Sequence, residues 1–180
     1  MKEKYDVPIA PESEFVSYMM EQMSQFGLPC TEEQAKDFYM YYARMIETNK
    51  YLNLTGITDM KEVVVKHMID SLSCYAPNII KSGMSIIDVG TGAGFPGIPL
   101  AIYDRSLKVI LFDSLKKRLT FLESVIDELK LTNCTTLHGR AEDLSHQDYR
   151  ESFDIATSRA VARLPIPVSY THLTLPTILR

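Results

Sequence analysis

The chain has few of the features that would place it among membrane, secreted or metal-binding proteins. No apolar run in its 180 residues approaches the roughly 18 needed to span a bilayer. The first ten residues lack the apolar core of a signal peptide. The three cysteines lie far apart without a CxxC pair, and the four histidines have no metal-ligand spacing. We therefore expect a cytoplasmic protein with free thiols, no metal and no membrane partner.

The chain also lacks a net positive charge. The formal net charge is −4, so the chain as a whole does not attract nucleic acid, and any RNA binding needs a local basic patch. Hydrophobic residues make up 46% of the chain, which is enough to build the core of one domain.

Glycine is rare, yet half of the eight glycines fall at positions 90, 92, 94 and 97. The segment from Gly92 to Gly97 satisfies the nucleotide-binding pattern GxGxxG. Asp113 follows at about the spacing of the acid that holds a ribose in such sites. The pattern predicts a nucleotide cofactor at this turn, whereas a purely structural glycine turn for strand–helix packing remains the simpler alternative.

The periodicity of apolar residues divides the chain near residue 80. Helical patterns cover 12–26, a stretch from the Thr31–Gln34 capping box to about Glu47, and 59–76, with a loop expected at 49–58. From Met84, short apolar strands alternate with helices. The strands are expected at 85–89, 107–112, 134–138 and 154–158, and the helices at 97–103 and 114–130. This alternation predicts a parallel sheet covered on both faces, with its ligand site at the carboxyl ends of the strands.

Two details favour S-adenosylmethionine over NAD at this site. Asp88 directly precedes the glycines, where its charge suits a cationic amino-acid group and repels a pyrophosphate. Pro96 lacks the N–H that a phosphate would use at a helix start. An NAD-dependent oxidoreductase stays the weaker alternative, because no second phosphate-binding helix start and no proton donor for hydride chemistry are visible.

Several longer motifs carry a family resemblance. DVGTGAGFPGIPLAI, FDSLKKRLTFL, GRAEDL and FDIATSRAVARL follow in this order, after NKYLNLTGIT and KHMIDSL. They resemble the bacterial small-subunit rRNA N7-guanine methyltransferases, also called glucose-inhibited division protein B, over residues 10–167. The resemblance implies an α/β fold, namely a Rossmann-like class I methyltransferase sheet with a helical N-terminal region. It also implies S-adenosylmethionine as donor and a guanine of 16S rRNA as acceptor. Thr48 stands where the family usually has tryptophan.

Resemblance and position together assign the donor site. Gly90 is expected at the methionine end with Phe95 beside it, and Asp113 at the ribose. Arg159 is expected to contact cofactor or substrate, with a salt bridge as the alternative, and Glu142 is either near the adenine or a solvated loop carboxylate. The complete predicted set is Asp88, Gly90, Gly92, Gly94, Phe95, Asp113, Ala141, Glu142 and Arg159.

The expected chemistry needs no catalytic side chain. Guanine N7 has a lone pair and no proton, so its attack on the sulfonium methyl requires no general base. The rate enhancement then comes from holding nitrogen, carbon and sulfur in line.

Basic and polar residues near the expected site are candidates for binding 16S rRNA or the small ribosomal subunit. The lysines and arginines have the simpler interpretation of a solvated face, and His67 that of a structural role. Asn49, Asn53 and Thr55 either position the acceptor base or cap the turn. The candidates are Asn49, Lys50, Asn53, Lys66, His67, Lys116, Lys117, Arg118 and Arg163. We expect a monomer. A non-catalytic RNA-binding or ribosome-assembly module that kept the fold is the main alternative function.

The domain organisation expected from these patterns has three parts. They are a helical N-terminal region at 1–80, a partial methyltransferase domain at 81–167, and a tail at 168–180. The tail segment VSYTHLTLPT resembles a translated sequencing adaptor and not the family's next helix. Four strands are expected instead of about seven, which would leave the fourth as an open edge. We therefore expect the 180-residue chain to aggregate or to bind its donor weakly.

Overall fold

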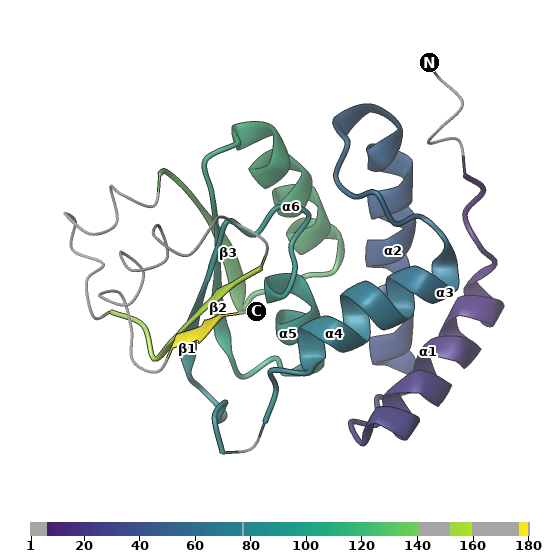
Figure 1. Ribbon diagram of the computed structural model, residues 1–180, viewed down its shortest axis with the longest axis horizontal. Helices are drawn as coiled ribbons and strands as arrows, with labels where there is room; N and C mark the ends of the chain where they lie inside the picture. Colours follow the sequence, from purple (N-terminus) through teal and green to yellow (C-terminus); the bar gives the residue numbers. More distant parts are fainter. Residues whose placement is uncertain (1–6, 77, 141–151, 160–176, 180) are drawn as a thin grey trace.

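The computed structural model describes residues 7–76, 78–140, 152–159 and 177–179. Figure 1 shows the N-terminal helices on one side and the sheet on the other, with α5 (Gly97–Tyr103) and α6 (Lys116–Glu128) between them. Among the described residues, no helix is both long enough and apolar enough to cross a bilayer.

The first helix, α1 (Glu12–Phe26), follows the predicted apolar stripe and buries Phe15, Met19 and Met23. It ends at Gly27, whose φ of 84° lies in the left-handed region that favours glycine. The sequence prediction for this helix is confirmed.

The second helix, α2 (Glu32–Leu52), begins at the predicted capping box between Thr31 and Gln34. It continues past the end predicted at Glu47, so the expected loop at 49–58 is wrong at its start. Thr48 and Asn49 are buried in this last turn, and Asn53 caps it in the left-handed conformation. Tertiary burial thus extends a helix through a polar segment that looks like a turn in the sequence.

The third helical segment changes its winding along its length. It begins as α3 (Met60–Val63), with the Asp59 side chain accepting a hydrogen bond from the Glu62 amide. It then passes through a π-helical stretch, η2 (Val64–Ile69), and ends as α4 (Asp70–Leu72), before the predicted end at 76. Such π turns often occur at functional sites.

The sheet is parallel throughout. Its strands lie in the order β3 (Cys134–His138), β2 (Lys108–Asp113), β1 (Ser85–Val89), β4 (Ile155–Ser158) and β5 (Thr177–Leu179). Helices α5 (Gly97–Tyr103) and α6 (Lys116–Glu128) form the first two crossovers. The strand order reverses between β1 and β4, which is where such sheets bind their ligands.

Alternate residues of β1 face two separate cores. Ile86 belongs to the large core beneath α5, α6 and the N-terminal helices, whereas Ile87 belongs to a smaller core on the opposite face with Phe112 and Phe153. Helix α2 packs against α5 and α6, and α4 packs against α5. The helical N-terminal region and the helix-covered face of the sheet therefore share one core.

The expected open edge at β4 is wrong. β5 pairs in parallel with β4, with Ala156 opposite Thr177, so β4 is internal to the sheet. The origin of the tail stays a prediction, and residues 168–176 of it lie outside the described part of the chain.

Candidate functional site

The glycine loop, residues 90–96, leaves the carboxyl end of β1 and leads into α5. Gly90 and Gly92 have φ values of 68° and 61°, in the left-handed region that other residues rarely adopt. A Cβ on Gly92 would meet nothing nearer than the Gly90 carbonyl oxygen, 3.9 Å away. Both glycines line a cavity, so their backbone is open to a ligand.

Gly94 and Gly97 pack against the protein and do not line the cavity, and cofactor binding by Gly94 stays a prediction. Gly94 is buried, and a Cβ there would lie 2.7 Å from Leu122 Cδ2 and 2.9 Å from Tyr41 Oη. A Cβ on Gly97 would lie 2.2 Å from Leu111 Cδ2. These two glycines let the loop and α5 pack against the protein, so the structural interpretation of the glycine pattern holds for half of it.

Asp88 lies behind the glycine loop and does not line the cavity, and its contact with the cofactor stays a prediction. It is fully buried, and its Oδ2 accepts hydrogen bonds from the Thr91 hydroxyl (2.6 Å) and the Gly97 amide (2.9 Å). Thr157 on β4 donates to Oδ1 at 3.2 Å. Burial raises the pKa of Asp88 to about 6, because desolvation outweighs these hydrogen bonds and the nearby charge of Arg159. Asp88 therefore ties the loop to α5 and β4.

Asp113 ends β2, as predicted, and reaches the loop from the neighbouring strand. Its Oδ2 accepts a hydrogen bond from the Gly92 amide at 3.0 Å, and its Oδ1 accepts one from the Leu115 amide at 2.8 Å. Arg118 lies 3.6 Å from Oδ2. Each carboxylate oxygen retains a lone pair, so Asp113 can still accept hydrogen bonds from a ligand beside Gly92.

Tyr41 on α2 is a loop contact that the sequence reasoning did not identify. Its hydroxyl donates to the Ala93 carbonyl oxygen at 2.6 Å, and its side chain is fully buried. Burial raises the pKa of this phenol well above its ordinary value, so it stays a donor. Tyr39, Tyr41 and Tyr42 stand close together in α2, and nothing in the sequence separates Tyr41 from the other two.

We expect Tyr41→Phe to weaken cofactor binding and to lower the free energy of unfolding by about 1–2 kcal/mol, because the Ala93 carbonyl loses a buried partner. The matched control is Tyr39→Phe, whose hydroxyl donates to the Ala10 carbonyl far from the loop. Calorimetric titration with S-adenosylmethionine and urea unfolding of both variants give the comparison. Equal cofactor affinity in the two variants would contradict the positioning role.

Three side chains from different elements stack beside the loop. The rings of His67 and Phe95 lie 4.6 Å apart at 23°, and the Arg159 guanidinium lies 5.0 Å from the centre of the Phe95 ring. Phe95 also touches Tyr41. The π-helical stretch, the loop and the end of β4 thus meet at one point, as expected for a site at the strand-order reversal.

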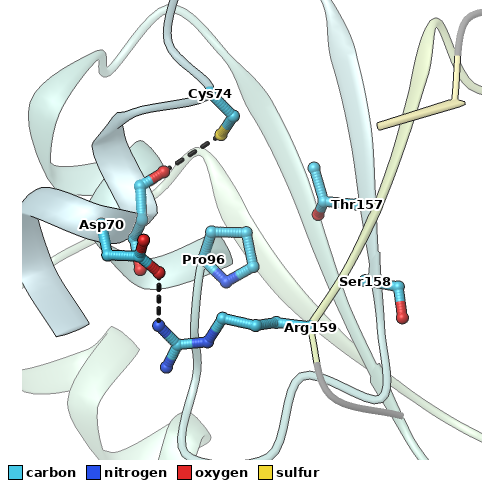
Figure 2. Close-up of a pocket in the computed structure, with 7 residues that line it drawn as sticks. Asp70, Cys74, Pro96, Thr157, Ser158 and Arg159 are labelled. Atoms are coloured by element: carbon cyan, nitrogen blue, oxygen red, sulfur yellow. Dashed lines mark hydrogen bonds and ion pairs between the residues drawn. The ribbon is translucent and has the colours of Figure 1, made fainter. Parts of the chain in front are cut away.

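Arg159 is held by the π-helical segment. It donates to the Lys66 carbonyl oxygen (3.3 Å), to Asp70 Oδ2 (3.2 Å) and to His67 Nδ1 (3.1 Å). A small cavity of about 20 Å³ lies beside the ion pair of Arg159 with Asp70. Figure 2 shows this ion pair, with Pro96 between the pair and Thr157 and Ser158 of β4. The predicted salt bridge is therefore present, and Arg159 also lines the larger cavity next to the glycine loop.

His67 is neutral at physiological pH. Burial and, second to it, the charge of Arg159 lower its pKa to about 4. Its second ring nitrogen, Nε2, lies 2.8 Å from the hydroxyl of Thr55. His67 therefore bridges an arginine and a hydroxyl and carries no charge of its own.

The glycine-loop cavity has a volume of about 190 Å³ and lies where these elements meet. Of the predicted residues, it brings together Gly90, Gly92, Phe95, Arg159, His67 and Arg118. Leu54, Thr55, Thr91 and Ala93 complete the lining. Asp113 borders it through its bond to Gly92.

The other predicted residues that the structure describes do not line this cavity. Asn49 is buried and clamps the Thr55 backbone, accepting from its amide and donating to its carbonyl, both at 2.9 Å. This supports the capping interpretation of Asn49. The others are exposed on helices or their caps: Lys50, Asn53, Lys66, Lys116 and Lys117. Ala141, Glu142 and Arg163 lie outside the described residues.

The fold defines a class of protein. A protein from Methanococcus maripaludis, assigned to the S-adenosyl-L-methionine-dependent methyltransferases, has a solved structure that matches with a TM-score of 0.51 at 17% identity. The match covers 69% of this chain and 61% of that one. With the parallel sheet and the glycine loop after β1, this is the Rossmann-like fold of class I S-adenosylmethionine-dependent methyltransferases, as predicted.

Sequence comparison identifies the family within that class. The family model described as rRNA small subunit methyltransferase G (GidB) matches residues 34–177. The chain belongs to this family, so the resemblance seen in the motifs is confirmed. The match extends beyond residue 167, where the motif resemblance was expected to stop.

Two curated relatives named ribosomal RNA small subunit methyltransferase G show the extent of the similarity. The protein from Lachnoclostridium phytofermentans is 46% identical over 89% of this chain, and that from Desulfitobacterium hafniense is 50% identical over 81%. The aligned segments cover 65% and 60% of those proteins, so the chain spans less than two thirds of their length.

Proposed function

We propose that this chain binds S-adenosylmethionine on the glycine loop and transfers its methyl group to N7 of a guanine in 16S rRNA, in the cytoplasm. The observation that carries the proposal is the glycine-loop cavity. Gly90 and Gly92 open their backbone to it at the strand-order reversal, with Asp113 on the neighbouring strand. In this arrangement the ribose hydroxyls donate to Asp113, and the methionine end lies along Gly90 beside Phe95 and Arg159.

The charge distribution favours this donor over NAD. A dinucleotide site uses the first amides of the helix after the glycines to hold a pyrophosphate. Here the Gly97 amide, at the start of α5, donates to the Asp88 carboxylate, and α5 has only seven residues. A pyrophosphate would meet an occupied amide and a buried acid.

The proposed transfer relies on positioning. The N7 lone pair attacks the methyl carbon as the sulfur leaves, so a formal positive charge passes from sulfur to the base and no proton is removed. A neutral His67 suits this step, because an imidazolium beside the guanine would oppose the developing charge.

The basic residues at the start of α6 support an RNA partner. This helix opens with Lys116, Lys117 and Arg118 and has no acid in its first turn. Positive charge at a helix start is unfavourable for the helix dipole, so the arrangement has a local cost. Helix stability therefore does not explain these basic residues, whereas neutralising RNA phosphates beside the cavity does.

The proposal is tested with tritiated S-adenosylmethionine and undermethylated small-subunit rRNA, either free or in assembled subunits. We expect label in 7-methylguanine after digestion. Label on cytosine C5 would contradict the mechanism, because that chemistry uses a cysteine nucleophile, and the described cavity is lined by none. Titration with S-adenosylmethionine and with NADH separates the alternatives: donor binding without transfer would support a non-catalytic assembly module, and NADH binding an oxidoreductase.

A further inference from the structure

Arg159, His67 and Thr55 form a row of hydrogen-bonded side chains, and their contacts determine where the hydrogens lie. An arginine is always protonated and can only donate, so His67 Nδ1, 3.1 Å from Arg159 Nη2, must accept. A neutral imidazole with Nδ1 as acceptor carries its hydrogen on Nε2. His67 therefore donates to the Thr55 hydroxyl oxygen, 2.8 Å away.

The Thr55 oxygen receives a second hydrogen bond from its own loop. The Ile57 amide donates to Oγ1 at 3.0 Å. A hydroxyl oxygen has two acceptor sites and one hydrogen, so both acceptor sites are now used. The hydrogen remains, and none of the described residues accepts it.

The position of Thr55 is fixed from behind. Asn49, buried in the last turn of α2, holds both the amide and the carbonyl of Thr55. Thr55 lines the glycine-loop cavity together with Gly90 and Gly92. A fixed residue with one unused donor thus faces the space in which the donor and the acceptor base are proposed to meet.

We propose that the Thr55 hydroxyl donates a hydrogen bond to O6 of the acceptor guanine and so selects guanine at this site. This inference rests on the proposed function and adds a specificity-determining residue to it. Adenine carries an amino donor in place of O6, so a site that offers only a donor rejects adenine.

A single hydroxyl suits the chemistry better than the usual arginine contact. Arginine commonly binds guanine through O6 and N7 together, but N7 must keep its lone pair free for methyl transfer. Here Arg159 is engaged with Lys66, Asp70 and His67. The hydroxyl of Thr55 can satisfy O6 and leave N7 available.

Nitrogen-15 NMR of the His67 ring in the unmodified protein tests which ring nitrogen carries the hydrogen. We expect Nε2 protonated and Nδ1 unprotonated from pH 5.5 to 8. A proton on Nδ1 would make Thr55 the donor to Nε2 and would overturn the proposal, because the hydroxyl would have no hydrogen left for a base.

The selection of guanine is tested by changing Thr55 in the protein and the base at the methylated position of the RNA. Thr55→Val removes the hydroxyl, and Thr55→Ser keeps it as the matched control. Substrate RNAs carry guanosine, inosine or 2-aminopurine at the methylated position; inosine keeps O6 and 2-aminopurine lacks it. We expect Thr55→Val to lower kcat/KM about tenfold on guanosine and inosine but hardly at all on 2-aminopurine, with Thr55→Ser near wild type.

The outcomes separate this inference from the proposed function. An equal loss on all three substrates would mean that Thr55 acts only through the fold and would overturn the inference alone. Failure of the wild-type chain to form 7-methylguanine would overturn the proposed function, and the Thr55 inference with it.

Discussion

Replacing Gly94 by alanine is expected to lower the free energy of unfolding by about 3–5 kcal/mol, a large part of the stability of a typical domain. Two costs add. The φ of 106° is strained for any residue with a Cβ. The new carbon would also lie 2.7, 2.8 and 2.9 Å from Leu122, Ile98 and Tyr41. None of these can move easily, because all three are fully buried and Tyr41 is bonded to the loop.

A matched variant separates the two costs. Gly83 has a φ of 82°, and a Cβ there would meet nothing within 4 Å. We expect Gly83→Ala to cost only about 1–2 kcal/mol from backbone strain. Urea unfolding of both variants, followed by circular dichroism, measures the difference. Equal losses would show that Gly94 does not pack against α2 and α6 as described.

Removing the carboxyl of Asp88 is expected to have the second-largest effect. At pH 5, Asp88→Ala should lower the free energy of unfolding by about 2–4 kcal/mol, since the Thr91 hydroxyl and the Gly97 amide each lose a buried acceptor. Thr157 retains the Ile87 carbonyl at 3.5 Å. Asp88→Asn keeps an oxygen for both donors and offers its amide hydrogen to Thr157, so we expect little loss.

The same pair of variants tests the pKa of Asp88. Because the folded-state pKa is raised from 3.8 to about 6, the folded chain holds this proton more tightly than the unfolded chain. The resulting stability is fully present below pH 3.8 and is lost as the pH rises through 6. Wild type should therefore gain about 1 kcal/mol over Asp88→Asn between pH 7 and pH 5.

Urea unfolding of both proteins across this range is the measurement. Other titrating groups cancel in the difference between the two proteins. A difference that does not change with pH, or that changes in the opposite direction, would show that the carboxyl is not desolvated behind the loop.

Local pattern alone determined much of the fold. The apolar stripe of α1, the capping box of α2, the alternation of strands with α5 and α6, and the place of Asp113 at the end of β2 all follow from periods and caps that neighbouring residues set. These are short-range effects, so a single sequence contains them. The motifs likewise sufficed to place the chain in its family.

Only the tertiary structure decided which residues face the cavity. Gly90 and Gly94 belong to one motif, yet Gly90 lines the cavity and Gly94 packs against α2. The difference arises because the path of the loop over the neighbouring elements decides which way each Cα faces. Asp88 faces the large core because alternate residues of β1 point to opposite faces of the sheet. Tyr41 and Thr55 reach the site from another part of the chain, through contacts between residues far apart in sequence, which no local pattern encodes.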